Sequence, residues 1–544
     1  MKIAMFHGYL LHGTGSNIYV QHVTNELIKL GHEVHLFCQE CHPERYPFIK
    51  RAIRVEDCHP SEYYYREGET GAILINPMLE LLPVYVMDKY PDIRQVKLFI
   101  KLSQKELGDY TNHNLSAYTM FFERFNYDIV HSNHLIMMPY FAGLLQQKYQ
   151  IPYIITPHGS SLVYTIQKDP RYEYFAIEGL RNASCVVTGN SYFRDRLIHV
   201  FKRYLSGLLD KMRIVSLGVD TNLFTPIFIE NKKSVLTTLR KQLSQSSGGK
   251  TRKDESVFLN KISSMNQDSI DEILRSVPSY SQKKPDESII YKLKGINPLT
   301  DRLLMFSGRL IVGKGIHVFL GAIIPLLSHY PDLKVLIVGA GPMREWSEWV
   351  VHAGSVGNLE MLKALIKWAR TNFNGKGYLW EPLTQFITSK EAMKFQSYRF
   401  NPSHVIFTGF LEHGYFAPLL ALAEWACFPS LVPESFGLVL VEAASCGVIP
   451  IASYFSGFKE ILDQFKDFLP GSIFPLLTLP NSGAEIIPRL IEKLTKLIEK
   501  KPKISSHLRR VAVLKYSWES TAVELDRIYS EIIQKNDYTL KGVL

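Results

Sequence analysis

The sequence predicts an α/β protein built from two doubly wound, parallel-sheet domains that face each other across a cleft. Length is the first observation, because 544 residues are too many for one ordinary core. The second is that short apolar runs alternate with helical patterns in two separate blocks. The third is the break between these blocks, where residues 231–288 are rich in Ser, Lys and Gln. In folds of this class the carboxyl ends of the strands form the ligand-facing edge.

The first block, residues 1–226, opens with a β-α-β pattern. It begins with an apolar run, continues with a helical pattern that stops at a glycine, and follows with a second apolar run. The alternation then continues to the end of the block, which predicts an N-terminal domain. The expected strands lie within residues 2–10, 33–39, 127–134, 151–159, 184–191 and 211–220, and the expected helices within 18–32, 140–149, 170–182 and 192–212.

The second block, residues 299–505, repeats the alternation and predicts a C-terminal domain. Residues 343–403 are too long for a plain connection, so we expect added helices there. The packed faces of those helices should carry Trp346, Trp349 and Trp368. The expected strands of this domain lie within residues 303–310, 334–342, 404–411, 424–430 and 447–455.

The remaining segments are a linker and a tail. Residues 227–298 should form a partly helical, partly flexible linker, since they contain few aromatic residues and a Gly-Gly pair. Residues 506–544 should form a C-terminal helix and tail, because "YSWESTAVELDRIYSEII" is amphipathic behind a Ser-Trp entry.

The distribution of charge argues against a nucleic-acid partner. The net charge is +10, but residues 1–226 are nearly neutral, and the basic excess lies in residues 230–300 and 485–520. Those basic residues are not interleaved with aromatic residues, and no helix-turn-helix, RNA-recognition or zinc-finger spacing occurs. We therefore expect no binding of nucleic acid.

The sequence favours a cytoplasmic protein. No run approaches the roughly 18 uninterrupted apolar residues of a membrane span, and the first residues are unlike a signal peptide. Six cysteines without a disulfide-framework spacing fit a reducing compartment. Residues 198–213 mix Phe, Tyr and Leu with Lys and Arg. A basic amphipathic helix there would allow weak peripheral contact with the inner membrane face, and an ordinary packed helix is the alternative.

Two cysteine-histidine strings resemble sites for a haem or a metal. "CQECH" at residues 38–42 matches the string of c-type haem attachment, and a Cys-His pair recurs at residues 58–59. Haem attachment requires an exported chain, and the spacing is too irregular for zinc. We expect neither group, no other cofactor and no bound metal.

The stretch "VPESFGLVLVEAASCG", residues 432–447, contains two glutamates in different settings. Gly437 should begin a helix, so that Glu434 lies in the preceding loop and Glu442 lies more than a turn inside. The backbone amides of Phe436, Gly437 and Leu438 would then form a helix N-terminus, which attracts a phosphate or a sugar oxygen. A carboxylate at position 442 could accept hydrogen bonds from two neighbouring ribose hydroxyls. The simpler alternatives are that Glu434 only complements the helix dipole and that Glu442 is an ordinary solvated helix residue.

The stretch "FSGRLIVGKG", residues 306–315, places Arg309 just after a buried strand and Lys314 between two glycines. Two cations at a strand-to-helix turn suit a departing diphosphate, because they neutralise its developing negative charge. A pair of ordinary surface charges is the alternative. The spacing of a P-loop is absent.

The first block offers further candidates at its strand ends. In "HGTGSN", residues 12–17, the glycines would let a phosphate or a sugar approach the backbone, although the third glycine of a dinucleotide fingerprint is missing. "HSNH" at 131–134 and "TPHGS" at 156–160 place histidines at two further strand ends. Two histidines at one edge favour contact with a substrate over structural roles.

Taken together, these motifs resemble the glycosyltransferases of family 4, which are retaining enzymes with the GT-B fold of two Rossmann-like domains. The motifs that carry the resemblance are "SLGVDTNLFTP", "SGRLIVGKG", "FTGFL" and "CFPSLVPESFGLVLVEAASCGVIPI". The resemblance covers most of the chain except about residues 230–298 and 343–403. It further implies that the last helix crosses back to the N-terminal domain.

The resemblance implies roles for the second block. Arg309 and Lys314 would hold the donor diphosphate, and Glu442 would hold the ribose. Glu434, with the amides of residues 436–438, would contact the transferred sugar. The two cations and the helix N-terminus would replace a divalent ion, so the family works without a bound metal.

The resemblance also implies roles for the first block. Gly15 and Ser16 would approach the donor phosphates from the N-terminal domain. His158 would lie near the transferred sugar and the acceptor, and it completes the expected catalytic set with Arg309, Lys314 and Glu434. His134 and Asn17 are the candidates for contact with the acceptor, which family members recognise mostly through variable loops, here residues 40–120.

The expected activity is transfer of a hexose from a nucleotide diphosphate sugar to a hydroxyl acceptor, with retention of anomeric configuration by front-face attack. The acceptor could be a glycan, a lipid-linked compound or a small molecule. The alternative is a non-catalytic protein that keeps the same two-domain shell and binds a sugar or a nucleotide sugar.

Overall fold

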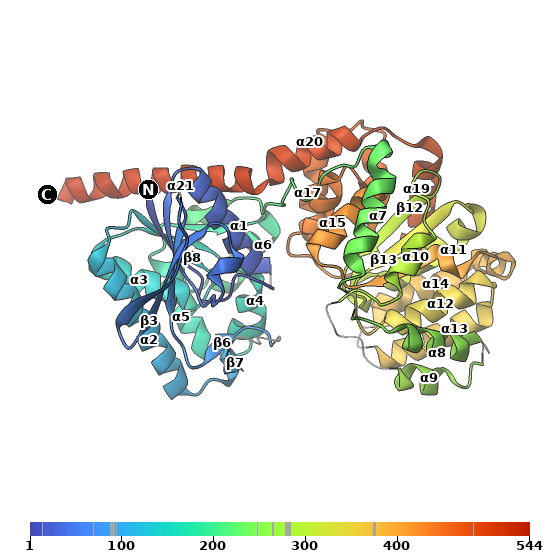
Figure 1. Ribbon diagram of the computed structural model, residues 1–544, viewed down its shortest axis with the longest axis horizontal. Coiled ribbons are helices and arrows are strands. Elements are labelled where there is room, and N and C mark those ends of the chain that lie inside the picture. The colour runs from blue at the N-terminus through green and yellow to red at the C-terminus, as the bar shows by residue number, and fades with distance from the viewer. Residues whose placement is uncertain are drawn as a thin grey trace. The chain divides into compact units, whose positions relative to one another are not determined.

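The computed structural model describes residues 1–544 except 14, 69, 88–92, 94, 247, 264–265, 278–283, 374–376, 482 and 544, and it describes no side chains at 390–393 and 537–543. These residues form two compact units (Figure 1). The first unit contains residues 1–218 and 515–544, and the second contains residues 219–514. Each unit is an α/β domain built on a parallel sheet, as the sequence predicts.

The first unit is built on a sheet with the order β11-β10-β9-β8-β1-β2-β5-β3-β4 among the described residues. All neighbouring strands pair in parallel except β3 and β4, which form an antiparallel hairpin. The strands are β1 (Lys2–Phe6), β2 (Glu33–Phe37), β3 (Ile49–Glu56), β4 (His59–Tyr65), β5 (Ala72–Pro77), β8 (Ile129–Asn133), β9 (Tyr153–Thr156), β10 (Cys185–Thr188) and β11 (Met212–Ile214), and β6 (Leu82–Val84) pairs with β7 (Val96–Leu98).

Helices cover both faces of this sheet, because the strand side chains alternate between two apolar cores. In β1, Ala4 and Phe6 enter one core while Ile3 and Met5 enter the other. The helices of this unit are α1 (Gly15–Lys29), α2 (Gln104–Arg124), α3 (Met138–Tyr149), α4 (Gly159–Ser161), α5 (Arg171–Arg181), α6 (Ser191–Phe201) and α21 (Trp518–Val543). A short π-helix, Leu162–Ile166, follows α4.

The last helix, α21, packs beside α1 on the first unit, which confirms the predicted return of the chain (Figure 1). Trp518, Leu525 and Tyr529 are buried in the same core as Val20 and Val23 of α1. The amphipathic pattern predicted the helix, and the apolar face of α1 provides the surface that buries it.

Two expectations for the first unit are wrong. The helix expected over 192–212 ends at Phe201, and residues 198–213 are no single amphipathic helix, because the chain turns at Gly207, whose φ of +75° is incompatible with a helix. Residues 40–120, expected to be variable loops, contain the hairpin β3–β4, strand β5 and most of α2. The sequence did not predict these strands, because β4 is largely exposed and shows little alternation of apolar and polar residues.

The second unit is built on a sheet whose described strands are all parallel, in the order β14-β13-β12-β15-β16-β17. The strands are β12 (Arg302–Ser307), β13 (Leu333–Val338), β14 (Val405–Gly409), β15 (Trp425–Phe428), β16 (Ile449–Ser453) and β17 (Thr478–Leu479). All but the short β17 were predicted as apolar runs.

Helices of the second unit come partly from the core alternation and partly from the two long segments. They are α7 (Lys232–Leu243), α8 (Arg252–Ser263), α9 (Ile270–Ser276), α10 (Ile289–Lys294), α11 (Ile316–His329), α12 (Arg344–Ser355), α13 (Leu359–Asn372), α14 (Glu381–Thr388), α15 (His413–Leu422), α16 (Leu438–Ser445), α17 (Ser456–Lys466), α18 (Phe474–Leu477), α19 (Ile486–Lys500) and α20 (Ser505–Tyr516), whose last two residues belong to the first unit. Trp346 and Trp349 are fully buried in α12, and Trp368 in α13 is half-buried.

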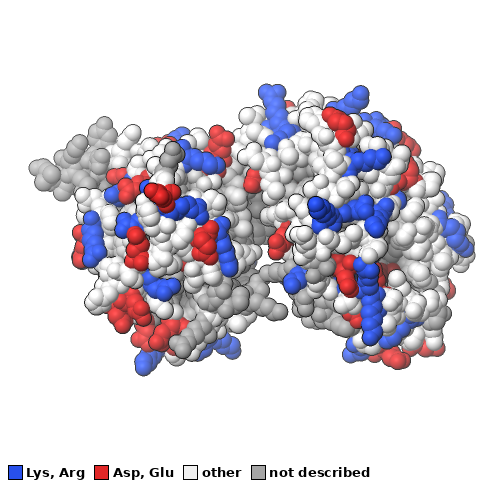
Figure 2. Space-filling view, in the orientation of Figure 1, with Lys and Arg blue, Asp and Glu red and all other residues white. Residues whose placement is uncertain are grey.

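Basic and acidic side chains are interspersed on the face of each unit drawn in Figure 2. Figure 2 draws one face only, and the expectation that nucleic acid is not a partner stays a prediction. Among the helices that the structure describes, none combines the length and the apolar character needed to cross a bilayer.

Candidate functional site

In the second unit, the predicted donor residues lie at the carboxyl edge of the sheet. The chain runs from the central β12 outward to β13 and β14, and then returns to β15 on the other side of β12. This reversal is the topological switch point, where open parallel sheets bind their ligands. Arg309 and Lys314 follow β12, and Glu434 follows β15, so these residues share the switch point.

The loop after β12 brings Lys314 against the loop after β15. Gly315 has a φ of +73°, and a Cβ atom there would lie 1.9 Å from the carbonyl oxygen of Pro429. Only glycine permits this approach. Lys314 is half-buried as a result, whereas Arg309 is exposed.

Lys314 and Glu434 form an ion pair, which the sequence did not predict. Lys314 Nζ lies 2.6 Å from each carboxylate oxygen of Glu434. The hydroxyl of Ser430 donates to the same carboxylate at 2.7 Å, and the backbone N–H of Glu434 donates to Ser456 Oγ at 2.9 Å. These contacts join the loops that follow the adjacent strands β12, β15 and β16, so the cation and the carboxylate hold each other in place.

Helix α16 begins where the sequence predicted. Gly437 is its N-cap with a φ of 110°, and a Cβ atom there would lie 2.4 Å from Phe458 Cδ1. The N–H groups of Gly437 and Leu438 have no acceptor inside the helix by its geometry, so this end of α16 suits an anion or a sugar oxygen. Phe436 is buried just before the helix.

Glu442 lies inside α16 and is 6% exposed, which excludes an ordinary solvated helix residue. Burial raises the pKa of its carboxyl group to about 7. His413 Nε2 lies 3.7 Å from Glu442 Oε1, and burial lowers the pKa of this histidine. A buried carboxylate at this distance from a weak partner retains the capacity to accept hydrogen bonds from hydroxyl groups.

In the first unit, the predicted glycine loop ends at the N-terminus of α1. Gly15 is exposed, and a Cβ atom there would meet nothing within 4 Å, so a ligand could approach the backbone. Ser16 is half-buried. Asn17 is buried, donates to the carbonyl oxygen of His12, and accepts from His7 Nε2 at 3.1 Å. The amide of Asn17 therefore holds the loop in shape.

The predicted histidines meet at the switch point of the first sheet, between β1 and β8. His158 Nε2 lies 3.1 Å from Asn133 Oδ1, and the His134 and His158 rings are 4.8 Å apart. His134 has a φ of +70°, which is uncommon outside glycine and marks a constrained position. His7, at the end of β1, stacks on the His134 ring at 5.5 Å.

His134 is 1% exposed, and in the described part of the chain neither of its ring nitrogens has a hydrogen-bond partner. Burial lowers its pKa well below the usual value, and the neighbouring His158 and His7 lower it further. Burial also lowers the pKa of His158 and that of His7. The three rings are therefore neutral near pH 7 and can act as uncharged hydrogen-bonding groups.

Sequence reasoning missed several residues at these two edges. In the first unit they are His7, Tyr9 and Tyr85, whose rings surround His134. In the second unit they are Ser430 and Ser456, which hold Glu434. The position of His7 directly after a strand was a usable signal, whereas the serines look like ordinary loop residues.

We found no group of three or more His, Cys, Asp or Glu side chains arranged to hold a metal ion among the described residues. All six cysteines are free.

Comparison with known proteins identifies relatives of both units. A sequence model of the family described as glycosyltransferase family 4 matches residues 13–223, and a model described as glycosyl transferases group 1 matches residues 388–501. A phosphatidyl-myo-inositol mannosyltransferase from Mycolicibacterium smegmatis is 24% identical over 238 residues. A D-inositol 3-phosphate glycosyltransferase from Corynebacterium urealyticum is 27% identical over 239 residues. The alignments span 43% of this chain, 46% of the first relative and 44% of the second, which is less than half of either.

Solved structures support the same fold over nearly the whole chain. The catalytic domain of starch synthase IV from Arabidopsis thaliana, bound to ADP and acarbose, aligns with a TM-score of 0.54 at 13% identity, covering 98% of this chain and 99% of that one. A glycosyltransferase from Rickettsia africae aligns with a TM-score of 0.51 at 13% identity, covering 98% of both chains.

Proposed function

The chain belongs to glycosyltransferase family 4 and has the GT-B fold, and on this premise we propose that it transfers a hexose from a nucleotide diphosphate sugar to a hydroxyl acceptor. The second unit binds the donor and the first unit binds the acceptor. One observation carries the proposal: Lys314, Glu434 and the N-terminus of α16 share the switch point of the donor sheet. Glu442 lies about one turn further along the same helix.

Cleavage of the bond between the sugar and the diphosphate leaves negative charge on the departing group. Arg309 and Lys314 supply two cations for that charge, and the N–H groups of Gly437 and Leu438 supply a helix N-terminus. These groups perform the neutralisation that a divalent ion performs in other enzymes, so the reaction proceeds without a bound metal or another cofactor.

The remaining donor contacts follow from position and charge. Glu434 contacts the hydroxyl groups of the transferred sugar through the oxygens that Lys314 and Ser430 already orient. Glu442 accepts hydrogen bonds from the ribose hydroxyls. Gly15 and Ser16, at the open N-terminus of α1, approach the donor phosphates from the first unit.

The acceptor meets the neutral histidines of the first unit. His158 lies near the transferred sugar, and His134 contacts the acceptor, supported by His7 and by Asn17 in the adjoining loop. The acceptor hydroxyl attacks the face that the diphosphate leaves, so the anomeric configuration is retained and no pair of general-base carboxylates is required. We place the reaction in the cytoplasm, with a glycan, a lipid-linked compound or a small molecule as the acceptor.

The test is release of nucleoside diphosphate from a panel of nucleotide sugars, with inositol phosphates and inositol lipids among the acceptors because two relatives are named for such compounds. Arg309→Ala and Lys314→Ala should each lower turnover about 10²-fold or more, the range for losing one preorganised donor to the transition state. Arg510→Ala, an exposed arginine on α20, is the matched control and should leave turnover unchanged. Near-normal turnover in both site variants would remove the assignment of the diphosphate site. Tight donor binding without any turnover would favour the non-catalytic alternative.

A further inference from the structure

Two pieces of the long segment 227–298 lie on the carboxyl edge of the donor sheet. We call residues 248–250 and 284–287 the strap. Gly249 N–H donates to Pro285 O at 2.8 Å, which joins the two pieces to each other. Asp286 N–H donates to Thr408 O at 2.9 Å, and Phe410 N–H donates to Lys284 O at 3.2 Å. The strap is therefore hydrogen-bonded to the end of β14 and to the loop that follows it.

Glycines allow this contact to be close. Gly409, the last residue of β14, has a φ of +74°, and a Cβ atom there would lie 2.5 Å from Asp286 Oδ1 and 2.9 Å from Lys284 O. A Cβ atom at Gly249 would lie 2.8 Å from the carbonyl oxygens of Lys284 and Pro285. Any larger residue at these positions would push the backbones apart. The strap therefore packs closely against the end of β14.

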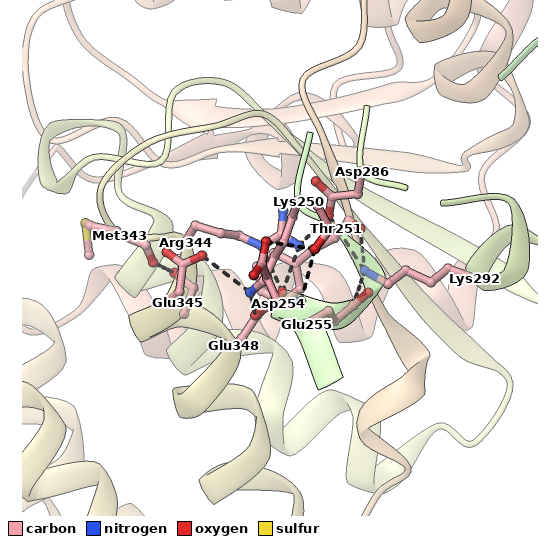
Figure 3. Close-up of polar contacts among 12 residues, drawn as sticks. Lys250, Thr251, Asp254, Glu255, Asp286, Lys292, Met343, Arg344, Glu345 and Glu348 are labelled. Carbon is pink, nitrogen blue, oxygen red and sulfur yellow. Dashed lines mark hydrogen bonds and ion pairs between the residues drawn. The ribbon is translucent and has the colours of Figure 1, made fainter. Parts of the chain in front are cut away.

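A buried cluster of charges holds the strap to helix α12 (Figure 3). Lys250 is 1% exposed, and its Nζ lies 2.7 Å from Glu348 and 3.3 Å from Glu345. Arg344 donates to Asp286 at 2.6 Å and to Glu348 at 2.7 Å. Burial alone would raise the pKa of Glu348, but Arg344 and Lys250 lower it to about 2, so this carboxylate stays ionised.

The main effect of the cluster is to fix the position of the strap on α12, and its effect on the stability of the fold is smaller. Removing charges from water is costly, and apolar residues of similar volume often serve stability equally well. Paired charges of fixed direction, in contrast, permit only one placement of the strap against α12. Helix α12 in turn follows the loop 339–343, which touches the loop of Arg309 through a hydrogen bond from Leu310 N–H to Ala340 O at 3.0 Å. The strap is thereby tied to the diphosphate side of the donor site.

The direction of the nucleoside follows from Glu442. Its carboxylate lies 3.7 Å from His413, and His413 is the first residue of α15, three residues after Phe410. A ribose held by Glu442 would therefore lie near His413, which follows the carboxyl end of β14, the strand to which the strap is hydrogen-bonded. Under the proposed function, the base attached to that ribose would extend toward Lys284, which is exposed and lines one small cavity with Gly339, Gly341 and Gly409.

We propose that the strap forms the nucleoside end of the donor site, with Lys284 donating a hydrogen bond to the base and the buried cluster of Lys250, Asp286, Arg344, Glu345 and Glu348 positioning it. This assignment rests on the proposed function. It concerns residues between 224 and 387, which neither family model matches. A lysine suits the task because every nucleobase offers ring nitrogen or carbonyl acceptors at its edge.

The experiment compares the binding of nucleoside diphosphates with that of inorganic pyrophosphate, by calorimetric titration of the full-length protein. Lys284→Ala should weaken the tightest-binding member of UDP, GDP and ADP about tenfold, the usual effect of one charged hydrogen bond. Pyrophosphate, which lacks a base, should bind as in the unaltered protein. Lys253→Ala, which removes an exposed lysine of α8 in the same segment, is the matched control and should change neither affinity.

A second variant tests the positioning role. Asp286→Asn keeps the shape of the side chain and removes its charge, so it should weaken nucleoside diphosphate binding while leaving pyrophosphate binding unchanged. A general loss of stability would not produce this split, because both probes bind the same unit. Thermal unfolding of each variant checks that it is folded.

The outcomes separate the two proposals. Equal binding of nucleoside diphosphates by Lys284→Ala and Lys253→Ala would overturn the strap assignment and leave the proposed function standing. An equal loss of pyrophosphate and nucleoside diphosphate binding in Lys284→Ala would place this lysine at the diphosphate and overturn its contact with the base. If the unaltered protein binds none of the probes, the proposed function falls as well.

Discussion

At the scale of single residues, burial decides the chemistry of the candidate groups. Glu442 is buried, its pKa is raised to about 7 by that burial, and the His413 ring lies 3.7 Å from its carboxylate. Glu434, in contrast, accepts from both Lys314 and Ser430. The two glutamates, eight positions apart, therefore differ in their chemistry. Glu434 is oriented by Lys314 and Ser430, whereas the carboxylate of Glu442 can accept hydrogen bonds from a ligand.

The raised pKa of Glu442 predicts that donor binding depends on pH. A carboxyl group with a pKa of about 7 is protonated below that value, and a protonated group loses one acceptor for the ribose hydroxyls. Affinity for the nucleoside diphosphate should therefore increase as the pH rises through about 7, and binding should release a proton. Calorimetric titration in buffers of different ionisation enthalpy measures both quantities.

Glu442→Gln supplies the control for this prediction. The amide keeps one acceptor and cannot ionise, so affinity should fall about tenfold at pH 8 and lose its dependence on pH. An unaltered protein whose affinity stays level across the same range, once titration of the phosphate is accounted for, would contradict the role of Glu442.

The histidines show the same principle in the first unit. His7, His134 and His158 come from loops after three different strands, and each has a lowered pKa because its ring is removed from water. Neutral imidazoles can donate from one nitrogen and accept at the other, which suits a hydroxyl acceptor better than a fixed charge does.

At the scale of elements, glycines at strand ends determine which loops can meet. Gly315 allows the loop after β12 to reach Pro429, and Gly437 allows α16 to start against Phe458. In both places a positive φ coincides with a contact too close for a side chain. The loops that carry Lys314 and Glu434 depend on these two positions.

Gly315→Ala should therefore destabilise the protein and weaken donor binding together. The left-handed backbone costs an alanine about 1 kcal/mol, and the clash with the carbonyl of Pro429 adds to it, so the free energy of unfolding should fall by about 2 kcal/mol or more. Denaturant unfolding measures the change. Gly471→Ala has no atom within 4 Å of the added carbon and should stay within about 0.5 kcal/mol of the unaltered protein. Equal stability of the two variants would mean that the β12 loop adapts without strain.

At the scale of the whole molecule, the chain ends in the unit where it began. Helix α21 starts with Trp518, whose ring stacks on His22 at 5.0 Å and closes over Gly218. Further along the helix, the hydroxyl of Tyr529 forms a hydrogen bond with His131 Nδ1 at 2.6 Å. The C-terminal segment is thus part of the core of the first unit, although residues 219–514, the whole second unit, separate it from the rest of that unit in the sequence.

Trp518→Ala should destabilise the first unit without removing nucleoside diphosphate binding. Truncating a buried tryptophan typically costs about 3–5 kcal/mol, and the cavity left between α1 and Gly218 lies wholly in the first unit. Calorimetric unfolding, followed with and without a nucleoside diphosphate, tests both parts.

Val523→Ala, on the exposed side of the same helix, should change stability by no more than about 0.5 kcal/mol. If Trp518→Ala abolished nucleoside diphosphate binding in folded protein, the assignment of the main donor contacts to the second unit would be wrong.

The sequence by itself determined the features that depend on local pattern. Apolar runs located most core strands, a glycine located the start of α16, and an amphipathic stretch located α21. The residues of the donor motifs were identifiable because strand ends and helix starts can be read from a few neighbouring positions. The hairpin β3–β4 escaped because its second strand is mostly exposed and lacks an apolar period.

Only the tertiary structure decided which of these residues meet. Lys314 and Glu434 are 120 positions apart, Lys250 and Glu348 are 98 apart, and His131 and Tyr529 are 398 apart. Each pair depends on the order of strands in a sheet or on the return of a helix, and no local pattern encodes either one. The physical reason is that a strand's apolar run specifies that it is buried but not which neighbour it pairs with, so long-range partners are set by packing of the entire fold.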